Sequence, residues 1–414
     1  MTKNIKPNRL YIVKNIFFVL FVVFCIQFTE LKLDVIKVSE VLLLLLTPLI
    51  YYKKINKWIL LLLLLFISWF LITMLLNPFR EFYLLREVSV LKTPYLITVG
   101  RFLELISCVN LAALTHQFFK NKSSEEIKLY VRDIFNFCFA LLLINIVIYY
   151  LYMNEYIINT RIVYWGDRLR GWFGEGGPYG LMLGFTFCLS FFYKSKFHLI
   201  TRAIILFAIL FLADSKAGFI LVLVWYFIFY YKKIYKKLQE FNIVFLVVGC
   251  VFLSLILVKL ADNYISDITH IKREVTQRPK DINLIMGRIA GIYIFPEMIQ
   301  DYPLLGIGLG NYPIMRNNPS YLGVIPVSPI GKTDAHGYGG LAQLLVDGGV
   351  FIFILFMYIM YLFYKKVKSL KEGLENYLLI FLCFFIFGVQ IYFLYPWVLL
   401  GILISLSSKE KLNE

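Results

Sequence analysis

The sequence predicts an all-α, polytopic membrane protein with about 12 transmembrane helices and one long, partly helical loop outside the membrane. Of its 414 residues, 60% are hydrophobic and only 16% are charged, against roughly 45–50% and about 25% in soluble globular proteins. The 39 Phe and 29 Tyr residues add more apolar surface than a soluble core of this size could bury. These observations exclude a soluble protein class.

Apolar runs long enough to cross roughly 30 Å of hydrocarbon recur along the chain. The pair of runs around 199–231 and the last pair are short, so the division of each pair into helices is open. The candidate spans are 13–29, 35–52, 58–76, 96–119, 132–153, 178–193, 199–213, 217–231, 241–259, 341–364, 375–391 and 395–407.

The net charge of +16 is explained first by the orientation of the chain in the membrane. If the N-terminus is cytoplasmic, the inner segments hold most of the Lys and Arg residues and the short outer loops hold few, as expected for a membrane protein. We therefore expect both termini in the cytoplasm, and we expect no nucleic acid as a partner. The six cysteines lie in apolar runs without metal-ligand spacing, and no Asp, Glu or His cluster has such a pattern, so we expect no metal and no cofactor.

The chain divides into three parts on this prediction. Residues 1–259 hold helices with short loops, residues 260–340 form an outer loop, and residues 341–414 hold the last helices and a cytoplasmic tail. Connections longer than about 12–15 residues are usually functional or disordered. The outer loop carries Tyr, Ile, Pro and Phe at structured spacing, so we expect it to fold and to carry site residues.

Two outer segments in the first part carry positive charges beside helix ends. In the segment 168–180, Arg168 and Arg170 precede a glycine-rich turn and an apolar run, which is the composition of an anion site. A solvated interfacial loop is the alternative. In the segment 214–218, Lys216 lies in a charged break between two short apolar runs. Such a break often marks a site, although a lysine near the membrane boundary can also extend to the lipid headgroups.

Two further segments belong to the outer loop. Arg288 stands at the start of a predicted amphipathic helix, and the later run Gly306–Gly310 predicts a glycine turn, because a dinucleotide motif would need a βαβ unit. His336 directly precedes a long span. A helix N-terminus keeps a histidine neutral, so His336 is a candidate general base. A structural role is the alternative for a single histidine.

Together these residues suit one reaction class. A base and several cations on the outer face fit a reaction that cleaves a phosphate ester and deprotonates a hydroxyl group. Because nucleotide sugars and ATP are absent outside the cytoplasm, we expect a lipid-linked phosphate donor.

The ordered set of motifs resembles the O-antigen polymerase and O-antigen ligase superfamily of bacterial envelope glycosyltransferases. The motifs are an Arg-containing loop before a span, a Ser-Lys break, an Arg followed by a helix and a Pro-x-x-Gly-x-Gly turn, and a His at the start of a span that carries an acidic-Gly pair. They correspond here to 168–180, Ser215-Lys216, Arg288, 303–308, His336 and Asp347-Gly348.

The resemblance implies a periplasmic, metal-independent transfer of sugar from undecaprenyl diphosphate to a hydroxyl acceptor in the inner membrane. It implies His336 as the base, Arg288 as a diphosphate ligand, and Lys216 at the position where the family often has Arg. Arg170 and Arg168 would complete the diphosphate site. Gly337 follows His336 where the family often has Asn. A chain-length regulator protein is an expected partner besides lipid-linked oligosaccharides and the bilayer.

Three functions remain open on the sequence. We expect a polymerase that joins repeat units by an inverting transfer, and a ligase that transfers polymer to lipid A-core is the alternative, because the motifs do not separate the two. A lipid or solute transporter would need charges near span centres. Lys37, Arg101 and Glu104 are the candidates for such charges, and Arg101 and Glu104 stand three residues apart, so they can pair on one helix face.

Overall fold

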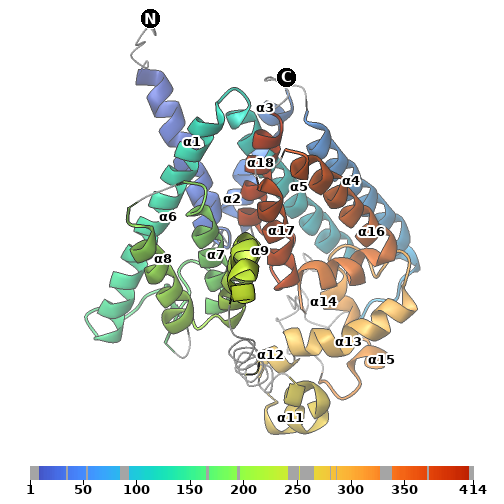
Figure 1. Ribbon diagram of the computed structural model, residues 1–414. Coiled ribbons are helices and arrows are strands. Elements are labelled where there is room, and N and C mark those ends of the chain that lie inside the picture. The colour runs from blue at the N-terminus through green and yellow to red at the C-terminus, as the bar shows by residue number, and fades with distance from the viewer. Residues whose placement is uncertain are drawn as a thin grey trace, which may run out of the picture.

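The computed structural model describes residues 9–33, 36–52, 55–83, 93–164, 167–193, 196–240, 251, 265–279, 281–285, 287–326, 338–370 and 373–409. Helices dominate this part of the chain (Figure 1), and its only strands form two antiparallel pairs. In these pairs β1 (Lys32–Leu33) lies beside β2 (Ile36–Lys37), and β3 (Val163–Tyr164) lies beside β4 (Arg168–Leu169). The predicted all-α class is confirmed.

The helices follow in three stretches. The first contains α1 (Arg9–Gln27), α2 (Val38–Leu45), α3 (Thr47–Tyr51), α4 (Lys57–Leu76), the 3-10 turn η1 (Asn77–Phe79), α5 (Pro94–Phe119), α6 (Ser124–Met153), α7 (Gly176–Leu189), α8 (His198–Phe207), the π-helical turn η3 (Ala208–Leu212) and α9 (Lys216–Glu240). The second contains α11 (Ile271–Gln277), α12 (Ile282–Ile285), α13 (Arg288–Asp301), α14 (Tyr312–Met315) and α15 (Pro319–Leu322). The third contains α16 (Gly340–Lys368), α17 (Leu374–Ile386) and α18 (Leu394–Ser407).

Local sequence explains where the long helices begin. Asn56 accepts a hydrogen bond from the Trp58 amide at the start of α4, and Ser123 and Glu126 form a capping box at the start of α6. Each satisfies amide groups that the first helical turn leaves without partners. The interior of α4 is apolar on all sides, as expected of a helix that contacts both lipid and protein.

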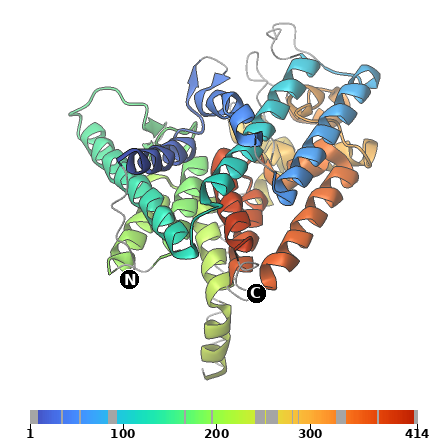
Figure 2. The same ribbon diagram turned by 90° about the horizontal axis from the view of Figure 1, so that it is seen from above.

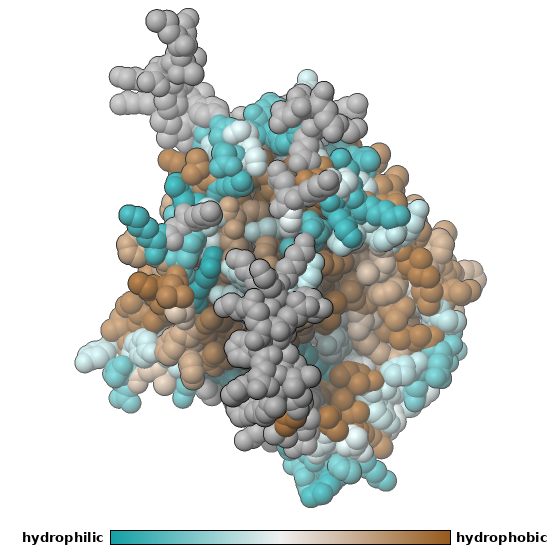
Figure 3. All heavy atoms as spheres, in the orientation of Figure 1, coloured by the Kyte–Doolittle hydropathy of each residue, from teal (hydrophilic) through white to brown (hydrophobic). Residues whose placement is uncertain are grey.

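Four described helical segments are long and apolar enough to cross a membrane: Lys57–Phe79, Pro94–Phe119, Ser124–Met153 and Gly340–Lys368. Shorter apolar helices accompany them, including α17 and α18. Hydrophobic side chains cover much of the middle of the visible face, and hydrophilic side chains gather at its two ends (Figure 3). The protein is therefore a helical membrane protein, while the number of about 12 spans stays a prediction.

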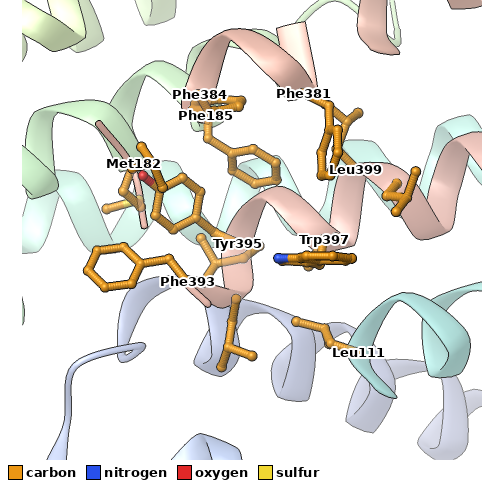
Figure 4. Close-up of a cluster of buried hydrophobic side chains, with 14 of the residues drawn as sticks. Leu111, Met182, Phe185, Phe381, Phe384, Phe393, Tyr395, Trp397 and Leu399 are labelled. Atoms are coloured by element: carbon orange, nitrogen blue, oxygen red, sulfur yellow. The ribbon is translucent and has the colours of Figure 1, made fainter. Parts of the chain in front are cut away.

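The helical bundle has two groups with α18 between them. One view places α1, α6, α7 and α8 on one side and α4, α5, α16 and α17 on the other (Figure 1), and a view from above agrees (Figure 2). The closest packing joins α18 to α5 and α7 to α9. Aromatic side chains such as Phe185, Phe384, Tyr395 and Trp397 fill the centre around α18 (Figure 4).

A second, smaller core lies at one end of the bundle. Helices α11–α15 gather there, opposite the end at which α1 begins and α18 ends (Figure 1). Ile289, Ile294, Tyr312 and Met315 are buried in this core, and Val346 of α16 joins it. The described part of the predicted outer loop therefore folds against the bundle.

The contact between α18 and α5 predicts a stability effect at a glycine. A methyl group on Gly401 would lie 2.6 Å from the Ala112 carbonyl oxygen and 2.7 Å from Thr115 Cβ. Overpacking of this kind costs about 1–3 kcal/mol, so Gly401→Ala should lower the thermal unfolding midpoint of the purified protein. Gly100→Ala in α5 is the matched control, because a methyl group there has no neighbour within 4 Å. Equal midpoints for the two variants would contradict the close packing.

Candidate active site

Arg288 is the first residue of α13 and lies where three segments meet. A methyl group built on Gly388, in the turn between α17 and α18, would lie 3.6 Å from Arg288 Cζ and 2.8 Å from the Tyr338 carbonyl oxygen. The Tyr338 hydroxyl donates a hydrogen bond to the Ile386 carbonyl at 3.4 Å. The half-buried guanidinium of Arg288 therefore stands beside both the start of α16 and the end of α17.

The start of α16 fits closely against this turn. Gly339 has a φ of 82°, and a methyl group there would lie 2.7 Å from Gln390 Nε2. Gly340, with a φ of 56°, would place a methyl group 1.8 Å from the Phe385 carbonyl oxygen. Both positions need glycine, because a side chain would meet strained backbone and occupied space. His336 lies outside the described residues, so its predicted position before α16 stays a prediction.

The glycine-rich turn after α13 is held by α16. Gly306, Gly308 and Gly310 all have positive φ, which L-amino acids with side chains rarely adopt. The Gly308 amide donates to the Asp347 carbonyl at 2.8 Å, and the Gly310 amide donates to Asp347 Oδ2 at 3.3 Å. Arg80 Nη2 donates to the Gly306 carbonyl at 2.7 Å. The predicted glycine turn is confirmed, and its amides bind protein groups of α16.

Four charges lie next to this turn, of which Lys37 and Glu40 are buried and Arg101 and Glu104 are partly buried. Lys37 Nζ contacts Glu40 Oε1 at 2.9 Å and Glu104 Oε1 at 2.7 Å. Arg101 Nη1 contacts Glu104 Oε2 at 2.7 Å, so the predicted pairing on one helix face is confirmed. The Arg101 guanidinium lies 4.4 Å from the centre of the Tyr392 ring. We call Lys37, Glu40, Arg101 and Glu104 the ion cluster.

The ion cluster touches the glycine turn directly. A methyl group on Gly310 would lie 2.5 Å from Arg101 Cγ, so the turn rests on the α5 side chain that bears one of the four charges. Arg101 therefore contacts both the turn and Tyr392. The turn, the ion cluster and the α17–α18 connection form one continuous site with Arg288 at its edge.

Arg168, Arg170 and Lys216 belong to a second group. Arg168 donates to the carbonyls of Ala213 and Asp214, with Nη2 2.8 Å from the Asp214 oxygen. Arg170 donates to the carbonyls of Arg161 and Gly174 at 2.8 and 3.1 Å. Lys216 is exposed at the first position of α9.

The two outer segments predicted separately therefore meet in the fold. Ser215 Oγ also donates to the Gly177 carbonyl at 3.0 Å, and the charged break is confirmed as the junction of η3 and α9. Much of the guanidinium surface of Arg168 and Arg170 binds loop carbonyls, so both arginines hold this corner together. Their diphosphate role stays a prediction.

Glu30 and three aromatic side chains join the second group to the first. A Glu30 carboxylate oxygen accepts a hydrogen bond from the Gly174 amide. Burial raises the pKa of Glu30 above its ordinary value, and the Gly174 amide opposes this shift. The Phe173 ring lies 6.4 Å from that of Tyr395, and the Tyr395 ring lies 6.4 Å from that of Phe393. Phe393 in turn lies 5.9 Å from Lys37 Nζ, so a continuous chain of contacts connects both groups.

Sequence reasoning missed several of these residues. Glu40, Gln390 and Tyr392 are not identified by the motifs, because they are polar side chains within or beside apolar runs. Polar residues inside such runs were the available signal, since intramembrane polar groups are usually functional or paired. Among the described residues, no group of three or more His, Cys, Asp or Glu side chains could hold a metal ion.

Residues 201–357 match a protein-family model described as O-antigen ligase. The matched stretch contains Lys216, Arg288, His336 and Asp347, and it ends before Gln390. No curated protein matches the chain.

The match confirms the resemblance drawn from the motifs. Residues 201–357 are similar to the O-antigen polymerase and ligase superfamily, whose members are glycosyltransferase-like enzymes. The fold and the match together define a helical membrane protein in which residues 201–357 resemble this superfamily.

The ion cluster predicts a specific pattern of stability. Lys37→Met should lower the thermal unfolding midpoint strongly, because removal of one partner from a buried ion pair costs about 3–5 kcal/mol. The double variant Lys37→Met/Glu40→Gln should recover part of the loss, because it removes the carboxylate left without a cation. Thermal unfolding of purified protein compares the two, and a double variant that is less stable than Lys37→Met would contradict the pairing.

Proposed function

We propose that the protein is an O-antigen (surface polysaccharide) polymerase. It joins oligosaccharide repeat units linked to undecaprenyl diphosphate at the periplasmic face of the bacterial inner membrane. The observation that carries the proposal is the meeting of Arg288, the start of α16 and the α17–α18 turn in one site. Arg288 and the start of α16 belong to the stretch that matches the family model, and the α17–α18 turn lies beyond it.

The chemistry divides between a cation and a base. The growing chain on one undecaprenyl diphosphate is the donor, and a sugar hydroxyl of a fresh unit is the acceptor. The acceptor oxygen forms a bond to the anomeric carbon of the donor while the bond from that carbon to the diphosphate oxygen breaks. Arg288 stabilises the departing diphosphate, and His336, placed by sequence alone, accepts the hydroxyl proton.

The reaction inverts the anomeric carbon, because the acceptor attacks opposite the leaving group. No metal takes part in this scheme, since guanidinium and ammonium groups neutralise the diphosphate. In this proposal the exposed Lys216 neutralises a second part of the anion, while Arg168 and Arg170 hold the loop beside it.

A ligase that moves finished polymer to lipid A-core is the second candidate, because the family match is compatible with either function. The two functions differ in the polysaccharide of a deletion strain. Loss of the polymerase should leave one repeat unit on lipid A-core, seen as a single step on a gel. Bare core with long lipid-linked polymer would identify the ligase, and an unchanged profile would contradict both.

The diphosphate role of Arg288 gives a second test. Arg288→Ala should lower the rate of polymer formation at least about 100-fold, as loss of a transition-state charge partner does elsewhere. Arg288→Lys should also be strongly impaired, because an ammonium group lacks the paired donors of guanidinium. Lys216→Arg should stay active. Arg273→Ala, at an exposed site in α11, is the control, and wild-type rates for Arg288→Ala at equal protein level would remove Arg288 from the mechanism.

The proposed orientation places α11–α15 in the periplasm and both termini in the cytoplasm. A cysteine at Ser320, which is exposed in α15, should react with an impermeant thiol reagent in intact spheroplasts. A cysteine at the exposed Glu125, in the first turn of α6, should react only after the membrane is opened. The reverse labelling pattern would place α11–α15 in the cytoplasm and contradict the proposed orientation.

A further inference from the structure

Three buried oxygen atoms near Arg288 have no hydrogen-bond partner in the part of the chain that the structure describes. They are Oδ1 of Asp347, Oε1 of Gln343 and Oε1 of Gln390. Their side chains are only 4%, 6% and 6% exposed. A buried polar atom without a partner costs about 1–3 kcal/mol, so three such atoms in one place require an explanation.

A closed ring of contacts brings these three side chains together. Gln343 Nε2 donates to Asp347 Oδ2 at 3.3 Å, and the Gln343 amide donates to the Gly339 carbonyl at 3.2 Å. Gly339 in turn lies directly against Gln390 Nε2. The three side chains therefore lie in one part of the site, at the start of α16 and the adjoining turn.

The other half of the ring passes through the ion cluster. Asp347 binds the Gly310 amide, Gly310 rests on Arg101, and Arg101 stacks on Tyr392, two residues after Gln390. Because Tyr392 and Gln390 belong to the same turn, the contacts form a closed ring within the described residues.

We propose that Asp347, Gln343 and Gln390 bind hydroxyl groups of the acceptor sugar, a role that rests on the proposed function. All three free atoms are acceptors, so their ligand must bring hydrogen-bond donors. A sugar offers several hydroxyl donors. A diphosphate offers only acceptors and is repelled by the Asp347 carboxylate, so it belongs on the Arg288 side.

The arrangement places the donor and the acceptor side by side. Gly388, which touches Arg288, lies two residues before Gln390 in the same turn. The donor diphosphate and the acceptor hydroxyls therefore occupy neighbouring places on one short connection. The acceptor sugar is held by oxygen atoms on α16 and the turn, and its reacting hydroxyl faces the donor. These residues position the acceptor and do not take its proton.

Asp347 also has a structural contact, which the test must separate from sugar binding. Its Oδ2 accepts from the Gly310 amide and from Gln343, whereas Oδ1 is the free atom. Asp347→Asn keeps one oxygen for the glycine turn and replaces the other with an amide donor. Gln390→Leu removes the free acceptor of that residue, and Gln390→Glu keeps an oxygen acceptor.

The probe is the repeat-unit oligosaccharide released by mild acid from the lipid-linked material of a deletion strain. Because it lacks diphosphate and lipid, it can occupy only the acceptor place. Its affinity for the purified full-length protein is measured by titration of tryptophan fluorescence or by the shift of the thermal unfolding midpoint. We expect Asp347→Asn and Gln390→Leu to bind it at least about 10-fold more weakly, and Gln390→Glu to bind within about threefold of wild type.

Two control variants complete the experiment. Gln27→Leu changes a buried glutamine whose amide contacts Met182 Sδ at 3.4 Å in the bundle, and it should bind the oligosaccharide as wild type does. Arg288→Ala should also keep oligosaccharide binding. Wild-type affinity in both Asp347→Asn and Gln390→Leu, or no binding by the wild type, would overturn the inference. The gel of the deletion strain tests the proposed function separately.

Discussion

Four charges lie wholly or largely inside the helical bundle because they neutralise one another. Lys37, Glu40, Arg101 and Glu104 form pairs at 2.7–2.9 Å, and a single unpaired charge at this depth would be costly. The pairs join α5 to the β2–α2 corner. They also fix Arg101, on which both the glycine turn and Tyr392 rest. The shape of the site therefore depends on this neutralisation.

The site separates two kinds of polar group. Arg288 supplies positive charge at the edge of the α17–α18 turn, and Asp347, Gln343 and Gln390 supply oxygen atoms a short distance along the chain. A glycosyl transfer from a lipid diphosphate needs both, since the leaving group is an anion and the acceptor is a hydroxyl. The glycines at 306, 308, 310, 339 and 340 allow the segments to approach closely enough to place these groups together.

Local features of the site could be predicted from sequence, and long-range ones could not. The pairing of Arg101 with Glu104 follows from helical spacing, and the start of α13 at Arg288 follows from its apolar period. The carbonyls that bind Arg168 lie 45 and 46 residues away along the chain, so its role in holding the loop is visible only in the fold. The roles of Glu40 and Gln390 depend on residues of other helices that only the fold brings beside them. The role of His336, outside the described residues, and the number of spans stay predictions.

The most direct measurement of the central claim uses purified protein in lipid vesicles with the lipid-linked repeat unit as the only substrate. Polymer length and released undecaprenyl diphosphate are followed together. The account predicts that one undecaprenyl diphosphate is released for each new glycosidic bond, without added metal or nucleotide, and that Arg288→Ala reduces both products equally. The account would be contradicted if correctly folded wild-type protein made no polymer, or if polymer grew without release of undecaprenyl diphosphate.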